Sequence, residues 1–302
     1  MLDSLVSKDR RRLALGLGAL AAGALALPRS VRAQERFSLF VPSTQPSVDR
    51  LISMSKLRDD DFVVDLGSGD GRIVFAAARA NAKLRGFGVD IQEHLVKQSN
   101  EEAKKAGLAD RVQFFHQNVF DADLSKVTVI YMWLFPELMR LLRPKIFAEA
   151  RPGTRVLTHL FDMGSWRADE RDTDGGTTAG LWIVPARVEG FWTWNLNVGG
   201  KPQRYDSILE QRFQDVEGIT RVGNRRGLFA NVRLRGEELA FTMDMTIEGA
   251  GLIRHEFSGR VGGDTITGTC RVGPEGEGRE QPWQAQRSST TQYVRCSGVD
   301  TK

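Results

Sequence analysis

The stretch DFVVDLGSGDGRIV, residues 61–74, constrains the fold more than any other part of the chain. Residues 62–66 are apolar apart from Asp65, which is typical of a strand buried on both faces. Three glycines follow, and from Arg72 the apolar residues recur with helical spacing. Because ligands of parallel sheets bind where strands end in such turns, this segment predicts an α/β fold with a ligand site on the turn.

The pattern of apolar strand followed by helix continues over residues 47–161. Continuous apolar strands separated by helices indicate a parallel sheet with helices on both faces. One helix ends at a glycine suited to a C-cap, Gly107. The expected strands are 62–67, 84–90, 111–118, 127–135 and 154–161, and the expected helices are 47–57, 72–82, 91–107 and 136–150.

After about residue 188 the pattern changes to short alternating strands with glycine-rich turns. Gly236 and the pair Gly262–Gly263 stand where hairpin turns are needed. This predicts a second, antiparallel all-β domain, a sandwich or a small barrel, over residues 189–302. Residues 167–180 are polar and glycine-rich and are expected to form a loop, and residues 180–190 fit either the last strand of the first sheet or the first strand of the second domain.

Residues 1–33 have the features of an export signal. A charged start containing Arg10, Arg11 and Arg12 precedes an apolar run, and a small-residue cleavage site follows at Ala33. The paired arginines favour the twin-arginine type of bacterial signal, which exports folded proteins, and hence a periplasmic location. An ordinary secretory signal and an uncleaved membrane anchor are the alternatives. The first globular domain is therefore expected over residues 34–188.

The charge distribution argues against a nucleic-acid partner. The whole chain carries a net charge of +4, and residues 1–33 alone account for +4, so the remaining residues sum to zero. Nucleic-acid binding depends on basic groups that neutralise phosphates. The two cysteines, Cys270 and Cys296, fit a disulfide and two buried thiols equally well, and no spacing typical of a metal site is present.

The spacing of the glycines selects the class of ligand. The nucleoside-triphosphate pattern GxxxxGK[ST] is absent, and Arg72 stands where a dinucleotide fingerprint needs its third glycine. Two carboxylates, Asp65 and Asp90, instead end neighbouring strands. Asp90 can accept both hydroxyls of a ribose, and Asp65 suits a cation where a pyrophosphate would be repelled. S-adenosylmethionine has a ribose, an ammonium group and a sulfonium group.

At these residues the chain resembles the class I S-adenosylmethionine-dependent methyltransferases. VVDLGSGDGR is similar to their first motif and GFGVD to their second, and the order of elements also agrees. FVPSTQPSVDRLISM, DLGSGDGRIV and HLFDMGSW resemble a bacterial subgroup similar to the lysine methyltransferases of the ATP synthase c-subunit type. The resemblance covers residues 39–187, and the C-terminal β domain lies outside it.

The resemblance implies a Rossmann-like methyltransferase sheet and assigns the cofactor contacts. Asp65 would lie near the amino group of the cofactor, directly or through water, and Asp90 would hold the ribose hydroxyls. Asn118 stands where many family members have an aspartate that contacts the adenine. The turn residues that would surround the methionine and ribose portions are Gly67, Ser68, Gly69 and Gly71.

Methyl transfer from a sulfonium is a direct displacement, so alignment and desolvation matter more than acid–base groups. A lysine acceptor must still lose a proton. The residues expected near the strand ends that could assist are Tyr131, Glu137, His159 and Asp162. The Asn/Asp-Pro-Pro-Tyr signature of amide and exocyclic-amine methylation is absent, which argues against a nucleic-acid base as acceptor.

Two functions are compatible with these features. The first is an exported methyltransferase with a substrate-recognising or oligomerising β domain. Its acceptor is a protein, where lysine is implied by the resemblance alone, or a small molecule or lipid. The second is a non-catalytic exported protein that uses a methyltransferase scaffold to hold an adenosine-like ligand. In both, contact with a membrane is expected only through an uncleaved N-terminal signal.

Overall fold

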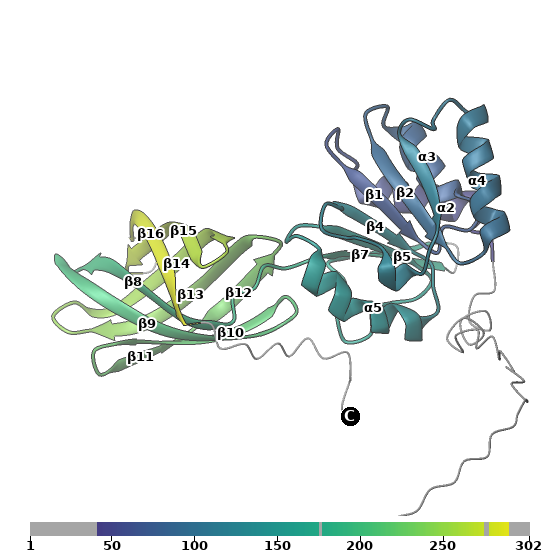
Figure 1. Ribbon diagram of the computed structural model, residues 1–302. Helices are drawn as coiled ribbons and strands as arrows, with labels where there is room; N and C mark the ends of the chain where they lie inside the picture. The colour runs from purple at the N-terminus through teal and green to yellow at the C-terminus, as the bar shows by residue number, and fades with distance from the viewer. Residues whose placement is uncertain (1–40, 175–176, 275–277, 290–302) are drawn as a thin grey trace, which may run out of the picture. The chain divides into compact units, whose positions relative to one another are not determined.

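The computed structural model describes residues 41–174, 177–274 and 278–289, which form two β-sheets (Figure 1). The expected export signal, residues 1–33, and Cys296 lie outside these ranges. No helix within them is long and apolar enough to cross a membrane. The first sheet has the strand order β3-β2-β1-β4-β5-β7-β6. Its strands are β1 (Phe62–Leu66), β2 (Arg85–Asp90), β3 (Val112–His116), β4 (Val129–Met132), β5 (Arg155–His159), β6 (Glu170–Asp174) and β7 (Thr177–Ile183).

The first five strands are parallel, and helices cover both faces of the sheet, as predicted. One face packs under α2 (Gln45–Ser55), α3 (Arg72–Ala80) and α4 (Glu93–Lys105), with buried residues such as Leu51 and Val96 in the same core. The other face packs under α5 (Pro136–Glu149) through Leu142 and Ile146. The order of strands reverses between β1 and β4, and this is the point where doubly wound sheets bind ligands.

The prediction of a loop over residues 167–180 is wrong. Strands β6 and β7 pair with each other, and β7 also pairs antiparallel with β5. Residues Ala179–Ile183 are buried in the core, whereas β6 is an edge strand whose polar side chains are compatible with solvent. Pairing with β5, a contact far along the sequence, therefore outweighs the local polar and glycine-rich composition. Residues 180–183 complete the first sheet, and the second begins at Gly190.

The second sheet is entirely antiparallel and has nine strands among the described residues, in the order β11-β10-β9-β8-β16-β15-β14-β13-β12. The sheet curls so that strands far apart in this order come together. Gly227 of β11 lies against Met243 of β13, and Phe229 N–H, just after β11, donates to Gly218 O of β10. The strands are β8 (Gly190–Val198), β9 (Lys201–Arg212), β10 (Asp215–Val222), β11 (Arg225–Leu228), β12 (Ala230–Arg235), β13 (Glu238–Ile247), β14 (Gly251–Gly262), β15 (Thr265–Gly273) and β16 (Arg279–Ser289).

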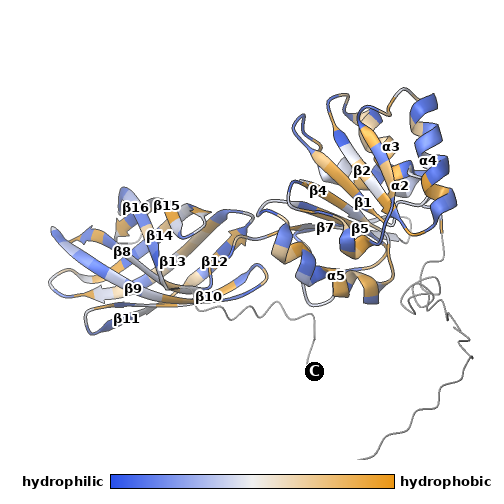
Figure 2. Cartoon of the chain, viewed as in Figure 1, coloured by the Kyte–Doolittle hydropathy of each residue, from blue (hydrophilic) through white to orange (hydrophobic). Residues whose placement is uncertain are grey.

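The inner face of this sheet carries an aromatic core. Apolar and polar residues alternate along its strands, as Figure 2 shows. Trp194 stacks on Tyr205 with ring centroids 5.5 Å apart, and Trp283 meets Trp194 edge-on at 5.9 Å. Cys270 is buried in the same core, and its pairing with Cys296 stays a prediction. Several strands are longer than expected, since β9 and β14 each have 12 residues.

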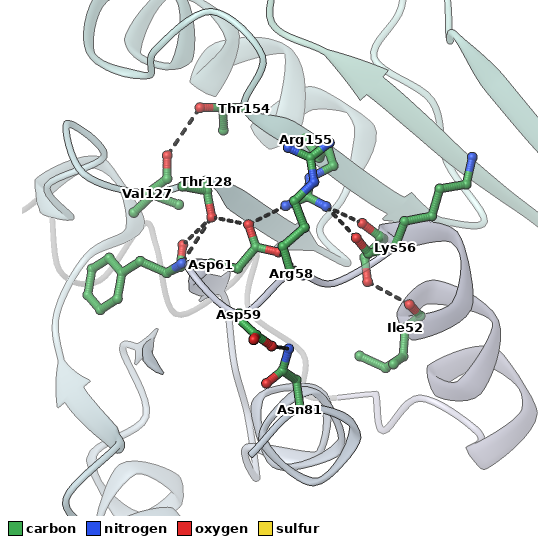
Figure 3. Close-up of polar contacts among 12 residues, drawn as sticks. Ile52, Lys56, Arg58, Asp59, Asp61, Asn81, Val127, Thr128, Thr154 and Arg155 are labelled. Carbon is green, nitrogen blue, oxygen red and sulfur yellow. Dashed lines mark hydrogen bonds and ion pairs between the residues drawn. The ribbon is translucent and has the colours of Figure 1, made fainter. Parts of the chain in front are cut away.

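A buried ion pair joins the strands at the amino-terminal edge of the first sheet (Figure 3). Arg155, at the start of β5, donates to the carboxylate of Asp61, just before β1. The same guanidinium donates to the backbone carbonyls of Ser55 and Lys56 at the end of α2, and Thr128 donates its hydroxyl to Asp61 at 2.7 Å. One carboxylate and one guanidinium thus connect α2 with β1, β4 and β5.

Removal of Arg155 should destabilise the protein strongly. The Arg155→Ala variant leaves the Asp61 carboxylate buried without its cation, and such losses cost about 3–5 kcal/mol of unfolding free energy. Chemical denaturation measures this change. Lys83→Ala, which removes an ion pair with Asp59 at the surface, is the matched control and should leave the free energy unchanged. Equal effects of the two substitutions would contradict the assigned role of Arg155.

Candidate functional site

The glycine turn lies at the carboxyl end of β1, where the strand order reverses. Gly67, Gly69 and Gly71 have φ angles of 86°, 52° and 80°, a region that favours glycine. Gly67 and Ser68 both donate their backbone N–H groups to Val89 O of β2, at 2.9 and 3.0 Å. The turn is therefore fixed against the end of the neighbouring strand before α3 begins.

Missing side chains allow the turn to approach β2 closely. A Cβ atom on Gly88 would stand 2.5 Å from Cβ of Ser68 and 2.6 Å from the ring of Phe114. A Cβ on Gly71 would stand 2.6 Å from the same ring. All three distances are shorter than real Cβ contacts. Gly88, in the middle of GFGVD, is thus required for the packing of the turn.

Asp90 connects the turn with the start of α4. Its Oδ2 accepts from Gly69 N–H at 2.8 Å, and its Oδ1 accepts from Gln92 N–H at 2.8 Å. Each carboxylate oxygen can accept a second hydrogen bond. The carboxylate is thus held in place at the strand end and retains the capacity to accept the two hydroxyls of a ribose.

Asp65 is the most unusual ionisable group of the site. Its side chain is only 2% exposed, and its Oδ1 has no hydrogen-bond partner among the described residues. Burial, with smaller contributions from Asp90 and Asp70, raises the pKa of Asp65 to about 8. The group is therefore mostly protonated at neutral pH, and a cation beside it would favour its ionised form.

These residues fit the cofactor that the sequence suggests. The unpartnered Oδ1 of Asp65 suits the ammonium group of S-adenosylmethionine, and the buried hydroxyl of Ser68 also has no partner among the described residues. Asp70, the third carboxylate near the turn, is paired with Arg72. The free oxygens of Asp65 and Asp90 can accept hydrogen bonds from a ligand, and because a cation beside Asp65 favours its ionised form, the site suits a cationic ligand better than a phosphate.

Asn118 has a structural role in the observed fold. Its Oδ1 accepts from Phe120 N–H at 3.0 Å and so caps the short 3-10 helix η1 (Val119–Asp121). Gln117 N–H donates to the backbone O of Asp90, which keeps this segment beside Asp90. Contact of Asn118 with an adenine stays a prediction.

The expected acid–base residues do not form one cluster. Tyr131 is fully buried on the face covered by α2, where Ser55 is close to its hydroxyl, and burial raises its pKa. Glu137 is exposed and pairs with Arg140, and Asp162 accepts from Gly164 N–H at 2.9 Å. The core position of Tyr131 gives no support to a catalytic role, and the roles of the others stay predictions.

His159, among these four residues, packs against an aromatic ring near the strand ends. At the end of β5 it packs against Trp133, which follows β4, with ring centroids 5.0 Å apart and an interplanar angle of 86°. Burial, together with the positive charge of Arg50, lowers the pKa of His159, so the imidazole is neutral at pH 7. Its Nδ1 is buried without a partner among the described residues.

Trp133 connects this pair with the glycine turn. The next residue, Leu134, lies so close to Gly67 that a Cβ there would stand 2.7 Å from Leu134 Cδ2. Residues 133–134 thus span from the turn to His159. The sequence has no periodic signal for this pairing, because His159 follows Trp133 by 26 positions and only the parallel pairing of β4 with β5 brings the two together.

A cavity of about 270 Å³ lies on another side of the turn, among residues of α2, α3 and α4. Asp70 and Arg72 line it, whereas Asp65 and Asp90 do not. The cavity is therefore distinct from the place where the two strand-end carboxylates meet the turn. Its other lining residues are Gln45, Phe75, Arg79, Gln98 and Glu102.

Binding of the cofactor should release a proton from Asp65. Because the pKa of this carboxyl is raised to about 8, its ionisation must accompany the binding of a cation, and the affinity should rise about tenfold per pH unit below that value. Titration calorimetry between about pH 6 and 7.5, where the cofactor's own amino group stays largely protonated, measures both effects. The number of protons released follows from the change in the observed binding enthalpy between buffers that differ in their enthalpy of ionisation.

Asp65→Asn is the matched variant for this experiment, since it keeps the size of the side chain and removes the titration. Its affinity should be independent of pH over the same range, without proton release. Binding to the unsubstituted protein without release of a proton would contradict the assignment of Asp65.

The part of the chain that forms the first sheet matches known methyltransferases. Residues 65–170 match the family described as the ANTKMT methyltransferase domain. The chain is 34% identical over 131 residues to a protein-lysine N-methyltransferase of Saccharolobus islandicus, which covers 43% of this chain and 81% of that protein. It is 26% identical over 184 residues to the Mus musculus lysine N-methyltransferase that is named for the c-subunit of ATP synthase, covering 60% of this chain and 68% of that protein.

Among solved structures, an RNA methyltransferase from Salinibacter ruber in complex with S-adenosyl-L-homocysteine is 42% identical, with a TM-score of 0.48. The match covers 49% of this chain and 96% of that one. The predicted likeness to the lysine methyltransferases of the ATP synthase c-subunit type is confirmed by the mouse relative. The chain therefore belongs to the same family of S-adenosylmethionine-dependent methyltransferases as the Saccharolobus enzyme.

Proposed function

We propose that the acceptor is the side-chain amine of a lysine in a protein. The observation that carries this proposal is the 34% identity to a protein-lysine N-methyltransferase, because the match extends over most of that enzyme. The zero net charge of residues 34–302 supports a protein acceptor over a nucleic acid, since it offers no general attraction for phosphates.

The cofactor supplies a methyl group on a sulfonium, and the acceptor nitrogen forms its bond to carbon as the bond from carbon to sulfur breaks. The chain's contribution is alignment. Asp90 would hold the ribose end through oxygens that the backbone of residues 69 and 92 already orients. Asp65 would hold the ammonium end. The lysine can bind as an ammonium, but it must release a proton to water before the neutral amine attacks the methyl group.

Trp133 and His159 are the groups we assign to the acceptor lysine. The indole is partly exposed and can pack against the methylene chain and the ammonium of a lysine, an interaction worth about 0.5–2 kcal/mol. The neutral imidazole supports the indole edge-on from the buried side. Phe135 and Leu160, both exposed, follow the same strand ends and extend the apolar surface that an acceptor would contact.

Labelling identifies the acceptor. The purified chain, incubated with methyl-labelled cofactor and separated protein, RNA and small-molecule fractions of its host, should label protein, and acid hydrolysis should release N-methylated lysine. Asp90→Ala is the control that should remove the label. Label in RNA or in small molecules would overturn the lysine proposal, and cofactor binding without any label would favour the non-catalytic binding protein.

Trp133→Leu should impair the acceptor and spare the cofactor. Loss of the cation–π contact predicts a KM for the acceptor protein that is about 2- to 30-fold higher, whereas the Kd for the cofactor stays within twofold. The acceptor KM of Trp133→Phe should lie between the values of the unsubstituted protein and of Trp133→Leu. Leu141→Ala, on the exposed side of α5, is the control and should change neither value. An unchanged acceptor KM in Trp133→Leu would contradict the assignment.

We also propose that residues 1–33 direct export of the folded chain by the twin-arginine route, which allows the protein to fold around its cofactor before transport. The charged start with Arg10 and Arg11, the apolar run and the small residues at Ala33 support this. In a bacterial host the mature chain should occur in the periplasmic fraction. Substitution of both arginines, Arg10→Lys with Arg11→Lys, should retain it in the cytoplasm. Retention of the unsubstituted chain in the cytoplasmic or membrane fraction would contradict the proposal.

A further inference from the structure

Leu160, the residue that follows β5, has a backbone conformation that leucine rarely adopts. Its φ angle is 70°, in the region that favours glycine. Phe161 N–H donates to His159 O at 2.8 Å, so these three residues form a γ-turn with a positive φ at its centre, which is the rare and strained form. Two further hydrogen bonds hold the turn. Leu160 N–H donates to Thr178 O of β7 at 2.7 Å, and Thr158 donates its hydroxyl to Phe161 O.

The apolar core does not account for this strained turn. Along β5 the side chains alternate between the two faces of the sheet, with Val156 in the core under α5 and Leu157 in the core under α2. Continued alternation would place residue 160 in the core under α5. The turn instead packs Phe161 against that core and leaves Leu160 45% exposed. The fold thus keeps a leucine in a strained conformation without burying it, and strain of this kind is typical of functional sites.

The exposed leucine lies at the surface that we assign to the acceptor. It directly follows His159, which packs against the indole of Trp133 with ring centroids 5.0 Å apart. Phe135, two positions after Trp133 and just before α5, is 42% exposed. Because β4 and β5 are neighbouring parallel strands, the residues that follow them lie at the same edge of the sheet. We call the exposed side chains of Phe135 and Leu160 the apolar rim.

We propose that Leu160 determines which lysines are methylated, by contacting an apolar residue next to the acceptor lysine. This inference rests on the proposed function, because it requires a protein lysine bound at Trp133. When the lysine side chain packs on the indole, the residue beside it in the acceptor lies over the apolar rim. A polar residue there would lose water without gaining a hydrogen bond, whereas an apolar residue would be stabilised by burial.

The acidic side chains near this edge of the sheet do not select a charged neighbour for the lysine. Asp162 follows Leu160 by two positions and lies 3.8 Å from Arg171. Asp172 of β6 lies 3.7 Å from Arg50. Each carboxylate is balanced by a guanidinium, so these groups favour neither a basic nor an acidic residue beside the lysine. The apolar rim therefore sets the preference.

Mapping of the methylated lysines tests this proposal. The full chain, incubated with methyl-labelled cofactor and the protein fraction of its host, should label lysines that mass spectrometry places next to apolar residues. Leu160→Ala should raise the KM of such an acceptor about 4- to 12-fold, the factor expected when about half of a leucine side chain loses its contact. Lys56→Ala, at the end of α2 and the opposite edge of the sheet, is the control and should leave this KM unchanged.

A second substitution separates the lost side chain from the backbone strain. Leu160→Gly and Leu160→Ala should raise the acceptor KM equally, but Leu160→Gly should unfold at a higher denaturant concentration, because glycine adopts a φ of 70° without strain. Lys56 has a φ of 48°, so Lys56→Gly should likewise be more stable than Lys56→Ala. Neither substitution of Lys56 should change the acceptor KM.

The results distinguish this proposal from the assignment of lysine as acceptor. If lysines with polar neighbours are labelled as readily as those with apolar neighbours, or if Leu160→Ala leaves the acceptor KM unchanged, the role of Leu160 is overturned and lysine remains the acceptor. If no protein lysine is labelled, the proposed function is overturned, and this inference with it.

Discussion

The site depends on one buried carboxyl group that the protein leaves without a partner. Asp65 lies within β1 with an oxygen that has no partner among the described residues, and its pKa is raised to about 8 by burial first and by Asp90 and Asp70 second. Its ordinary pKa is 3.8, so the folded ligand-free protein binds a proton that the unfolded chain releases between about pH 4 and 8. The stability contributed by this group therefore falls as the pH rises through that window. A cation bound beside Asp65 would stabilise the ionised carboxylate and so offset this loss of stability. Binding of the cofactor would therefore also stabilise the fold.

The rest of the first sheet keeps this carboxyl in its position. At the open edge, Asp90 and Val89 fix the glycine turn through backbone hydrogen bonds. At the opposite edge, the Asp61–Arg155 pair joins α2 to three strands, so that β1 is held at both ends. The closeness of Gly88 to Ser68 adds a steric requirement between them. The buried carboxyl of Asp65 is thus held between fixed contacts at the two edges of the sheet.

The features of this site that depend on residues close together in the sequence could be predicted from the sequence. The turn, its two carboxylates and the alternation of strands with helices all follow from residues close together along the chain, and the structure has them. The strand pair β6–β7 was not predicted, because its polar composition indicates a loop and its strand identity comes from pairing with β5. Tyr131 was placed at the open edge by its position in β4, but alternation alone does not reveal that its side chain points into the core under α2. The raised pKa of Asp65 likewise depends on burial that only the folded chain has.

The relation of Trp133 to His159 has a consequence for how acceptor and cofactor are coupled. Leu134 contacts the turn at Gly67 while its neighbour Trp133 contacts His159, so a single extended segment touches both halves of the proposed reaction. The turn is already fixed by its hydrogen bonds to Val89 and Asp90, so its contact with Leu134 gives the indole a fixed position beside the proposed cofactor site. The proposed acceptor surface and the proposed cofactor site therefore keep one relative position. A fixed position favours transfer, because the methyl group and the amine must lie in line for the displacement to proceed.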